Sequence, residues 1–421
     1  MKSTKNHQKL AVVKPQLDTQ PAAMEPLLPE SSRAELAELT CEILRKAGQL
    51  SGQVTTLIVR QRVGQLVREM NSYYSNLIEG HKTLPRDIER ALRQDYSGNP
   101  TERANQHLNR AHIEVEERMI RRLENEPELS IHSMDFLSWL HSEFYGRLPK
   151  EMHFSTDRAG KPYRIEPGAI RQFEVEVGNH QPPHFGALGK FTNRFDQFYS
   201  NSRILATNQL VALGAAHHRL TWIHPFGDGN GRVARLYSHA WLVRAQIDSF
   251  GLWTLSRGLA RQRKEYYQQL SNADNRRWND YDGRGNLSDR ALGEFTLFFL
   301  KVMLDQIDFM TDLLQLHNLS TRIERYLHFE ALAIPAKLRD RVARLLKAAL
   351  IDGKIERGKV ASIVGLRGTA ARQVIRLALA EGLLDSPTPK GPLSLVFSSK
   401  TLESYFPQLY QDLPVETPSG P

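Results

Sequence analysis

The chain has 421 residues, 40% of them hydrophobic and 24% charged, a typical globular composition with enough length for two or three domains. Its formal net charge of +9 favours anionic partners such as nucleotides or nucleic acid. The single cysteine, Cys41, excludes an intrachain disulfide and a cysteine zinc cluster. Because the sequence lacks an apolar run of about 18 residues, we expect no membrane partner and a cytoplasmic location.

Most of the chain has a helical pattern. Residues 1–32 are rich in Lys, Gln, Pro and Ser without periodicity, which predicts a disordered tail. From residue 33 onward, apolar residues recur at three- and four-residue spacing, as in amphipathic helices. This spacing predicts helices over 33–50, 53–79, 85–94, 102–124 and 132–145 and, later, over 190–200, 203–222, 231–246, 258–272 and 288–317. The expected fold class is mainly α.

One segment departs from the helical pattern. Residues 171–178, RQFEVEVG, alternate Phe173, Val175 and Val177 with polar and charged residues, which is the period of a half-buried strand. The two prolines in the following NHQPPHF forbid a helix and a central strand. We therefore expect one small β-hairpin within the helical domain.

A second unit is expected over 333–421. A helix over 337–351 precedes a short helix in ERGKVASIVGL, which ends at Gly365, and a longer helix in GTAARQVIRLALAEGLL. The turn-rich DSPTPKGPLSLVFSS that follows is typical of a β-ribbon. This order predicts a winged helix-turn-helix domain. It would follow an N-terminal helical region over 33–130 and a central core over 131–320.

Residues 223–235, IHPFGDGNGRVAR, form the strongest candidate for a binding site. Pro225 disfavours helical dihedral angles at His224, so the preceding helix has to end there. A new helix then begins near Gly231, with Gly229 and Asn230 at its N-terminus. Free backbone N–H groups and the positive end of the helix dipole make such a terminus a site for phosphate.

Charged side chains surround this expected phosphate site. Arg232 and Arg235 are three residues apart in the first turn, so both can reach one anion. Asp228 is a hard oxygen ligand that suits Mg²⁺ beside a phosphate. His224 is a residue type whose ordinary pKa lies close to neutral pH, as a general base requires.

Three other interpretations fit the same residues. GNGRVA fits a dinucleotide-binding fingerprint, but that motif follows a strand, whereas a helical pattern precedes it here. The segment that begins at Asp228 resembles a calcium loop, but Arg232 and His239 occupy two of the required ligand positions. DGNG also occurs as a simple helix cap. The adjoining histidine and arginines favour the phosphate site.

The segment resembles the signature of the Fic (filamentation induced by cAMP) family, HPF-x-[D/E]-G-N-G-R-x-x-R, and residues 224–235 meet every specified position. The similarity includes AAHHRLTWI before the signature and LSRGLARQRKEYYQQL after it, and it extends over about 53–320. Leu220 departs from the family's usual aromatic residue and is expected to face the core.

The resemblance implies a protein adenylyltransferase that transfers AMP from ATP to a Ser, Thr or Tyr hydroxyl of a target protein and releases pyrophosphate. The implied site residues are the catalytic base His224, the Mg²⁺ ligand Asp228, the anion hole Gly229, Asn230 and Gly231, the phosphate ligands Arg232 and Arg235, and Tyr266 or Tyr267 as an adenine contact. The resemblance also implies that glycine at position 231 favours nucleotidyl transfer over phosphorylation, because relatives that act as kinases carry a bulkier residue there. An enzyme that uses another phosphate-linked donor in place of ATP remains an alternative.

The helix over 53–79 ends in a second motif. Ser75-Asn-Leu-Ile-Glu79-Gly80 resembles the inhibitory motif [S/T]-x-x-x-E-[G/N] of Fic proteins, N-terminal to the core. The resemblance implies that Glu79 pairs with Arg235 and keeps this arginine from the γ-phosphate. The same glutamate could position water for the removal of AMP, which is a further alternative.

Residues 171–184 match the position of the family's flap, with VGNHQPP resembling V-G-x-H-x-P-P. An exposed strand edge there can pair with an extended segment of a target protein, or of the chain itself in self-modification. His180 is then expected to support the flap. A zinc site of His180, His184, His217 and His218 is disfavoured because these histidines lack a metalloprotease-like spacing.

The expected winged helix is basic, which makes DNA a second candidate partner through 333–421. Its cations include Arg341, Arg344, Lys347, Lys354, Arg357, Lys359, Arg367, Arg372 and Arg376. Arg372 and Arg376 would share one face of the recognition helix. A DNA-binding regulator whose core senses nucleotide is therefore the alternative from another class, and a homodimer is also left open.

Overall fold

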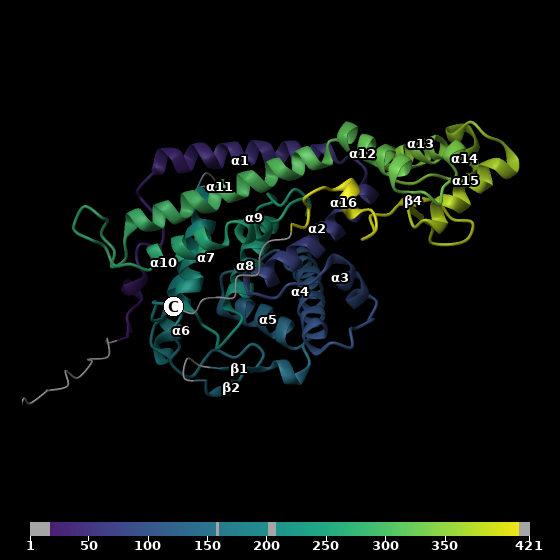
Figure 1. Cartoon of the computed structure of the whole chain (residues 1–421). Coiled ribbons are helices and arrows are strands. Elements are labelled where there is room, and N and C mark those ends of the chain that lie inside the picture. The colour runs from purple at the N-terminus through teal and green to yellow at the C-terminus, as the bar shows by residue number, and fades with distance from the viewer. Residues whose placement is uncertain (1–16, 157–159, 201–207, 412–421) are drawn as a thin grey trace, which may run out of the picture.

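The computed structural model describes residues 17–156, 160–200 and 208–411, and these residues form a mainly α-helical protein (Figure 1). The first and largest part contains α1 (Arg33–Gln53), α2 (Leu57–Ile78), α3 (Pro85–Leu92), α4 (Pro100–Asn125), α5 (Met134–Tyr145), α6 (Leu188–Tyr199), α7 (Gln209–Ile223), α8 (Asn230–Arg244), α9 (Leu255–Arg261), α10 (Arg263–Ala273), α11 (Asp289–Leu314) and α12 (Leu316–Phe329). None of the described helices combines the length and apolar character that crossing a bilayer requires.

The helices pack around α8, which carries the signature residues. Helix α8 contacts α7, α4, α5 and α9, while α2 packs against α4 and α9. The long helices α1 and α11 lie side by side along one edge of the bundle (Figure 1). The buried faces of these helices join in one apolar core that includes Phe136, Phe191, Leu236 and Phe299. Leu220 is buried in it, as predicted from the sequence.

Local sequence signals explain where several of these helices begin. Asn99 precedes Pro100 and accepts hydrogen bonds from the backbone N–H groups of Thr101 (2.9 Å) and Glu102 (3.2 Å), so it caps α4. Ser133 caps α5 by accepting from the N–H of Phe136 (3.2 Å). Such caps satisfy backbone groups that the first helical turn leaves unpaired.

The predicted tail over 1–32 is wrong for residues 17–32, while residues 1–16 lie outside the described residues. A 3-10 helix, η1 (Pro21–Met24), buries Met24 completely, and Leu27 is also buried. The N–H groups of Glu30 and Ser31 each donate to the carboxylate of Asp289 at 2.8 Å. The sequence shows no periodicity here because the segment is fixed by contacts with distant residues.

The predicted strand over 171–178 is also wrong, because these residues form only an isolated bridge between Val177 and His180. The small hairpin lies earlier in the chain, where β1 (Phe154–Thr156) pairs antiparallel with β2 (Pro162–Arg164). Phe173 and Val175 are partly buried, so the alternation correctly marks an extended segment. A strand also needs a neighbouring backbone to pair with, and the pattern carries no information about that neighbour.

Two helix predictions need correction after residue 255. The predicted helix 258–272 is two helices, since the chain turns at Gln262 between the buried α9 and the more exposed α10. The predicted helix 288–317 ends at Leu314, and α12 follows as a separate helix. Residues 201–207 of the predicted helix 203–222 lie outside the described residues.

The C-terminal unit contains α13 (Ala336–Asp352), α14 (Arg357–Val364), α15 (Gly368–Ala380), β3 (Leu384–Asp385), β4 (Ser394–Leu395) and α16 (Leu402–Tyr405). The strands β3 and β4 pair antiparallel, and a bridge joins Ile355 to Leu393. This unit projects from one end of the molecule (Figure 1). After α16 the chain returns to α2, where the hydroxyl of Tyr74 donates to the carbonyl of Leu409 (3.0 Å).

Candidate active site

His224 stands at the C-terminal end of α7 in a left-handed backbone conformation, with φ of 49° and ψ of 62°. Only a few per cent of residues other than glycine have a positive φ. The break that Pro225 predicts is therefore present at the expected residue. The carbonyl of His224 accepts from Nε of Arg171 (2.9 Å), which joins the loop of His224 to the segment 171–184.

The imidazole of His224 has a defined orientation. Its Nδ1 lies 3.3 Å from the carbonyl of Thr221, so Nδ1 carries the proton and Nε2 is the free acceptor. Burial, followed by the positive charges of His180 and Arg171, lowers the pKa of His224 to about 4. The ring is therefore neutral at neutral pH and can accept a proton.

The loop after His224 is held by Asn230. The amide of Asn230 accepts from the N–H of Phe226 (3.0 Å) and donates to the carbonyl of Phe226 (2.9 Å). Gly229 precedes α8 with φ of 78°, a conformation that glycine adopts without steric cost. The side chain of Asn230 thus shapes the loop, and its contribution to an anion site is limited to the backbone.

Asp228 is positioned by two residues of α5 that the sequence did not single out. The hydroxyl of Tyr145 donates to Oδ2 of Asp228 (2.8 Å), and Nε2 of His141 donates to its carbonyl (3.2 Å). Burial opposes ionisation, but Arg232 and this hydroxyl hold the pKa of Asp228 below its usual value. The carboxylate is 41% exposed and ionised, which suits a hard cation. The spacing of His141 and Tyr145 in the sequence puts both on one face of the helix, and this was the signal that could have marked them as site residues.

Arg232 lies in the first turn of α8 with an incompletely satisfied guanidinium. Its Nη2 lies 3.7 Å from Oδ2 of Asp228, and the group stacks over the ring of Phe144 at 4.9 Å. Its Nε is buried and has no hydrogen-bond partner among the described residues. A buried donor of this kind is costly to leave unpaired, so it favours an anionic ligand at this position.

Arg235 is held by residues at the C-terminal end of α2. Its Nε donates to the hydroxyl of Ser75 (2.9 Å), and its Nη2 donates to the carbonyl of Ser75 (2.9 Å) and to Oε1 of Glu79 (2.6 Å). Burial raises the pKa of Glu79, but Arg235 and Arg232 outweigh it and hold this pKa below its usual value. The structure therefore contains the ion pair between Glu79 and Arg235.

Glu79 is placed by the way in which α2 ends. Gly80 has φ of 90°, its N–H donates to the carbonyl of Leu77 (2.9 Å), and the N–H of His81 donates to that of Asn76 (2.9 Å). These two bonds form a Schellman motif, which requires a left-handed residue at Gly80. A Cβ at Gly231 would lie 2.5 Å from Oε1 of Glu79, so residue 231 has to be glycine while Glu79 stays in place.

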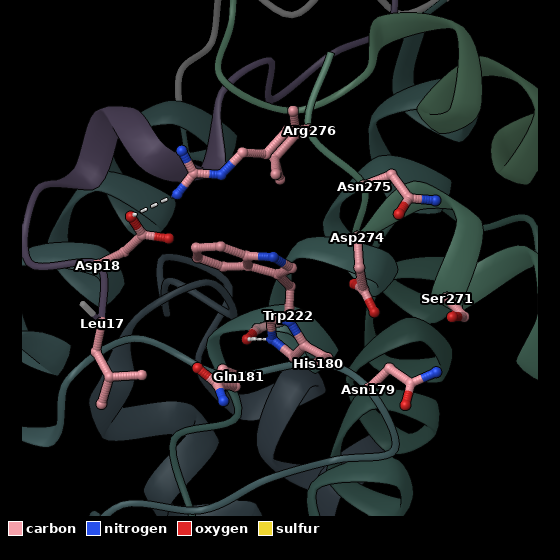
Figure 2. Close-up of a pocket in the computed structure, with 11 residues that line it drawn as sticks. Leu17, Asp18, Asn179, His180, Gln181, Trp222, Ser271, Asp274, Asn275 and Arg276 are labelled. Atoms are coloured by element: carbon pink, nitrogen blue, oxygen red, sulfur yellow. Dashed lines mark hydrogen bonds and ion pairs between the residues drawn. The ribbon is translucent and has the colours of Figure 1, made fainter. Parts of the chain in front are cut away.

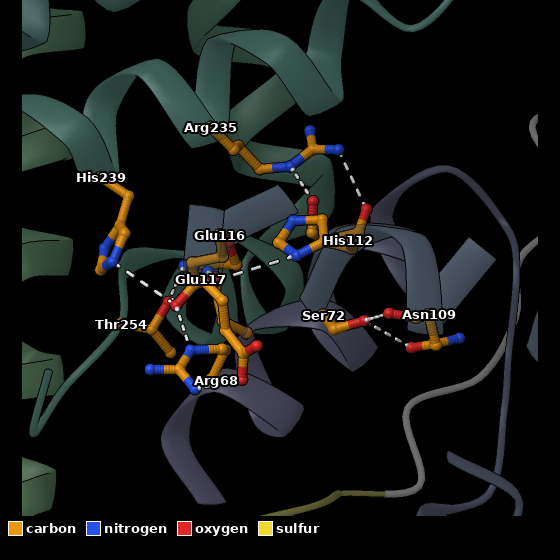
Figure 3. Close-up of polar contacts among 12 residues, drawn as sticks. Arg68, Ser72, Asn109, His112, Glu116, Glu117, Arg235, His239 and Thr254 are labelled. Atoms are coloured by element: carbon orange, nitrogen blue, oxygen red, sulfur yellow. Dashed lines mark hydrogen bonds and ion pairs between the residues drawn. The ribbon is translucent and has the colours of Figure 1, made fainter. Parts of the chain in front are cut away.

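A buried polar cluster fixes α2 against α4 and α8, on the N-terminal side of Ser75 (Figure 3). Glu116 is 4% exposed and accepts from Nδ2 of Asn71 (2.6 Å), and Nε2 of His239 lies 3.5 Å from it. The hydroxyl of Ser72 donates to the carbonyl of Asn109 (2.9 Å). The hydrogen bonds from Asn71 and Ser72 to residues of α4 hold α2, and hence Glu79, in one orientation.

The two tyrosines proposed as adenine contacts have different surroundings. Tyr266 is 1% exposed, and its hydroxyl bonds with Nε2 of His217 (2.7 Å). This burial argues against an adenine contact by Tyr266. Tyr267 is 43% exposed, and its hydroxyl donates to the carbonyl of Ile78 (3.2 Å), next to Glu79.

A pocket of about 230 Å³ lies beside the segment 171–184. His180 and Trp222 meet at its centre, where Nε2 of His180 bonds with the carbonyl of Trp222 (2.7 Å), and Asp18 and Arg276 face each other at one side (Figure 2). Arg171, which the sequence analysis did not single out, donates to the carbonyl of Pro183 (2.6 Å). His180 and Arg171 thus attach this segment to the loop of His224.

Part of the chain is similar to known proteins. The model of the Fic/DOC family matches residues 133–242. The chain is 38% identical over 81 residues to "Protein adenylyltransferase Fic" of Aedes aegypti and 40% identical over 81 residues to the protein of that name from Drosophila erecta. Each match covers 19% of this chain and only 16% of the relative.

Among solved structures, a Fic family protein from Desulfovibrio desulfuricans G20 aligns with a TM-score of 0.50 at 18% identity, over 88% of this chain and 98% of that chain. The likeness covers the mainly α-helical fold with its small antiparallel sheets. Residues 133–242 of this chain are therefore similar to the Fic/DOC family.

Proposed function

We propose that this protein transfers AMP from ATP to a hydroxyl group of a target protein, and that Glu79 inhibits the transfer by occupying Arg235. The observation that carries the proposal is the arrangement at the start of α8. There a neutral histidine, an ionised aspartate and a partly unpaired Arg232 surround a helix N-terminus, while Ser75 and Glu79 satisfy Arg235.

His224 supplies the base. Its free Nε2 takes the proton of the target hydroxyl as the hydroxyl oxygen attacks the α-phosphorus. The new bond between oxygen and phosphorus forms while the bond from the α-phosphorus to the bridging oxygen of pyrophosphate breaks. The bond between Nδ1 and Thr221 keeps the ring in the tautomer that this step requires.

The start of α8 supplies the anion site. The backbone N–H groups of residues 229–231 and the guanidinium of Arg232 would bind the phosphate oxygens and stabilise the charge that develops on them. Asp228, ionised and 41% exposed, is the residue fitted to hold Mg²⁺, which draws charge from the phosphate oxygens when bound. Tyr145 holds its carboxylate in position.

Inhibition would follow from competition for Arg235. A γ-phosphate cannot use the donors of Arg235 that already bind Ser75 and Glu79. Release of Glu79 frees them and removes a negative charge from the phosphate site. Coupling between two such sites is typically worth about 1–3 kcal/mol, which corresponds to a change of about 5- to 150-fold.

We assign target binding to residues 171–184. This segment is neither helical nor part of a regular strand, and Val177 and His180 form an isolated bridge within it. An extended target segment could therefore add its backbone there and present a hydroxyl to His224. The hydrogen bonds from Arg171 to the carbonyls of His224 and Pro183 would hold this segment at a fixed position relative to His224.

The proposal is tested by supplying ATP labelled at either the α- or the γ-phosphate to the wild type and to Glu79→Gly, His224→Ala and Glu79→Gln. We expect protein labelling from the α-position, strongest in Glu79→Gly and lost in His224→Ala. Glu79→Gln keeps the volume but not the charge and should fall between the wild type and Glu79→Gly. Labelling from the γ-position alone would show a kinase instead.

A second candidate is the removal of AMP from a modified protein. Glu79 favours it, because its side chain is 28% exposed beside the phosphate site and could orient a water molecule. In this case the wild type would release AMP from a purified AMP-modified target, whereas Glu79→Gly would not.

A further inference from the structure

We propose that the C-terminal unit binds double-stranded DNA, with α15 in the major groove. Residues 333–411 contain thirteen Lys and Arg residues and six Asp and Glu residues, so they hold most of the chain's excess positive charge. The stretch from Arg357 to Ala380, which spans α14 and α15, has five of these cations and lacks acidic residues. This charge matches a polyanionic partner.

The two faces of α15 differ. Ala371, Val374, Ile375 and Ala378 are buried, and α15 packs against α13, α14 and β3. The opposite face exposes Thr369, Arg372, Gln373 and Arg376. Arginine and glutamine side chains form paired hydrogen bonds with the edges of guanine and adenine, and threonine and arginine bind phosphates.

Nearby carboxylates do not neutralise this face. Glu381, just after α15, pairs with Lys400 at 2.5 Å, and Asp385 pairs with Arg62 of α2. Within the described part of the chain, neither Arg372 nor Arg376 forms a salt bridge. These two guanidinium groups are therefore available to an external anion.

The hairpin of β3 and β4, which corresponds to the wing of a winged helix, is fixed beside the helices. Nε of Arg357 donates to the carbonyl of Gly391 (2.9 Å), which holds the turn between β3 and β4 next to α14 and leaves Lys390 exposed. Arg341 donates to the carbonyl of Val364 (2.8 Å) at the end of α14, so it serves the fold. Figure 1 shows α14 and α15 at the far end of the molecule.

The test is binding of the full chain to a labelled duplex of about 20 base pairs, followed by fluorescence anisotropy over increasing salt. We compare the wild type with Arg372→Glu/Arg376→Glu and with the matched charge control Arg103→Glu/Lys190→Glu, whose residues are exposed on α4 and α6. The double variant of α15 should bind at least about tenfold more weakly, with a salt slope reduced by about 2, and the control should behave as wild type.

The same sequence as double-stranded RNA distinguishes the class of partner. The deep, narrow major groove of A-form RNA does not admit α15, so we expect weaker binding than to DNA. Equal binding to RNA, equal weakening by both double variants, or no salt-dependent binding to DNA would each overturn the proposal.

A different observation leads us to a second inference, that residues Gln408–Gln411 hold α2 in its inhibitory position. The hydroxyl of Tyr74 donates to the carbonyl of Leu409 (3.0 Å) and accepts from the N–H of Gln411 (2.9 Å). The ring of Tyr410 contacts Tyr73 at 5.2 Å and stacks with Tyr74 at 6.4 Å. Arg257 of α9 donates to the carbonyl of Gln408 (2.9 Å).

These contacts end one residue before Ser75, which binds Arg235. A change that lifts 408–411 from α2 would therefore loosen Ser75 and Glu79 together and release Arg235. This inference depends on the proposed function for its effect on AMP transfer, but its structural part can be measured separately.

The test compares Tyr410→Ala with Tyr410→Phe, a matched control because the Tyr410 hydroxyl has no hydrogen-bond partner among the described residues. We expect Tyr410→Ala to speed amide hydrogen exchange over 75–80 and to raise labelling from α-labelled ATP, each about 2- to 10-fold. Tyr410→Phe should match the wild type, and adding Tyr410→Ala to Glu79→Gly should have no further effect.

The outcomes separate this inference from the proposed function. Unchanged exchange and labelling in Tyr410→Ala, with an active Glu79→Gly, would overturn the inference and leave the inhibitory pair intact. An inactive Glu79→Gly would contradict the proposed function, and exchange would still decide whether 408–411 hold α2.

Discussion

The arginines of the core and those of the C-terminal unit are used in opposite ways. Arg171, Arg219 and Arg235 are nearly completely buried, and each donates to carbonyl or carboxylate groups of distant segments. Arg372 and Arg376 are exposed on α15. Buried guanidinium groups with several protein partners position elements of the fold, whereas exposed ones can bind a partner. The net charge of the chain therefore does not by itself locate the nucleotide site.

The largest expected effect is on stability, at Arg219. Its guanidinium is fully buried and donates to the carbonyl of Pro26 at 2.9 and 3.0 Å, which attaches the N-terminal segment to α7. Arg219→Ala leaves that carbonyl unpaired beside a cavity and should destabilise the protein by about 2–5 kcal/mol. Arg376→Ala should change stability by less than about 0.5 kcal/mol.

Thermal unfolding followed by circular dichroism checks this difference. Arg219→Met is the matched control, since it keeps much of the volume but none of the donors, and it should lie between Arg219→Ala and the wild type. Similar midpoints for Arg219→Ala and Arg376→Ala would contradict the contrast between buried and exposed arginines.

The next effect is on the reaction, at Arg232. In the Glu79→Gly background, Arg232→Ala removes an unpaired donor beside the proposed phosphate site and should lower kcat/KM for transfer of α-label by about 10²–10³-fold. Arg372→Ala in the same background should leave it unchanged, because α15 lies far from α8 (Figure 1). Equal losses in both variants would mean that Arg232 does not bind the nucleotide.

The sequence was sufficient for the parts of the site that local rules determine. Pro225 marks the end of α7, and Gly229 and Gly231 mark the start of α8, because these residue types restrict or extend backbone conformation wherever they occur. The partner of Glu79 followed from the resemblance to the Fic family, and the structure places the two groups 2.6 Å apart.

The remaining parts depend on contacts between distant segments. Tyr145 and His141 reach Asp228 from another helix, and Arg171 reaches the loop of His224 across more than fifty residues. The segment 171–178 has the alternation of a strand, but pairing requires a neighbour that the pattern does not specify. Packing of 17–32 likewise depends on Asp289 and Arg219.

A smaller effect is expected at Ser75. Ser75→Ala removes the bond between its hydroxyl and Nε of Arg235 but leaves the backbone bond and Glu79 in place. One hydrogen bond of this kind contributes about 0.5–1.5 kcal/mol, so labelling should rise about 2- to 10-fold. An increase larger than that of Glu79→Gly would show that Ser75, and not Glu79, is the main restraint on Arg235.

The smallest expected effect concerns two glutamates in and just after α2, whose contributions to stability should change with pH in opposite directions. The pKa of Glu79 is held below its usual 4.5, with burial opposed and outweighed by Arg235 and Arg232. Its stabilising contribution is therefore present above pH 4.5 and lost as the pH falls through the lowered pKa. Burial raises the pKa of Glu69 to about 7, so Glu69 destabilises the fold increasingly as the pH rises from 4.5 to about 7.

Unfolding midpoints measured between about pH 4 and 7 therefore test both signs. As the pH falls below 4.5, the advantage of the wild type over Glu79→Gln should shrink, because the unfolded state binds a proton at Glu79 that the folded state, paired with Arg235, does not. As the pH rises from 4.5 to about 7, the wild type should fall behind Glu69→Gln, because Glu69 ionises in the unfolded state while the buried carboxyl of the folded state keeps its proton. The same trend in both variants would contradict the contrast between Glu79, whose carboxylate is paired with Arg235, and Glu69, whose ionisation burial disfavours.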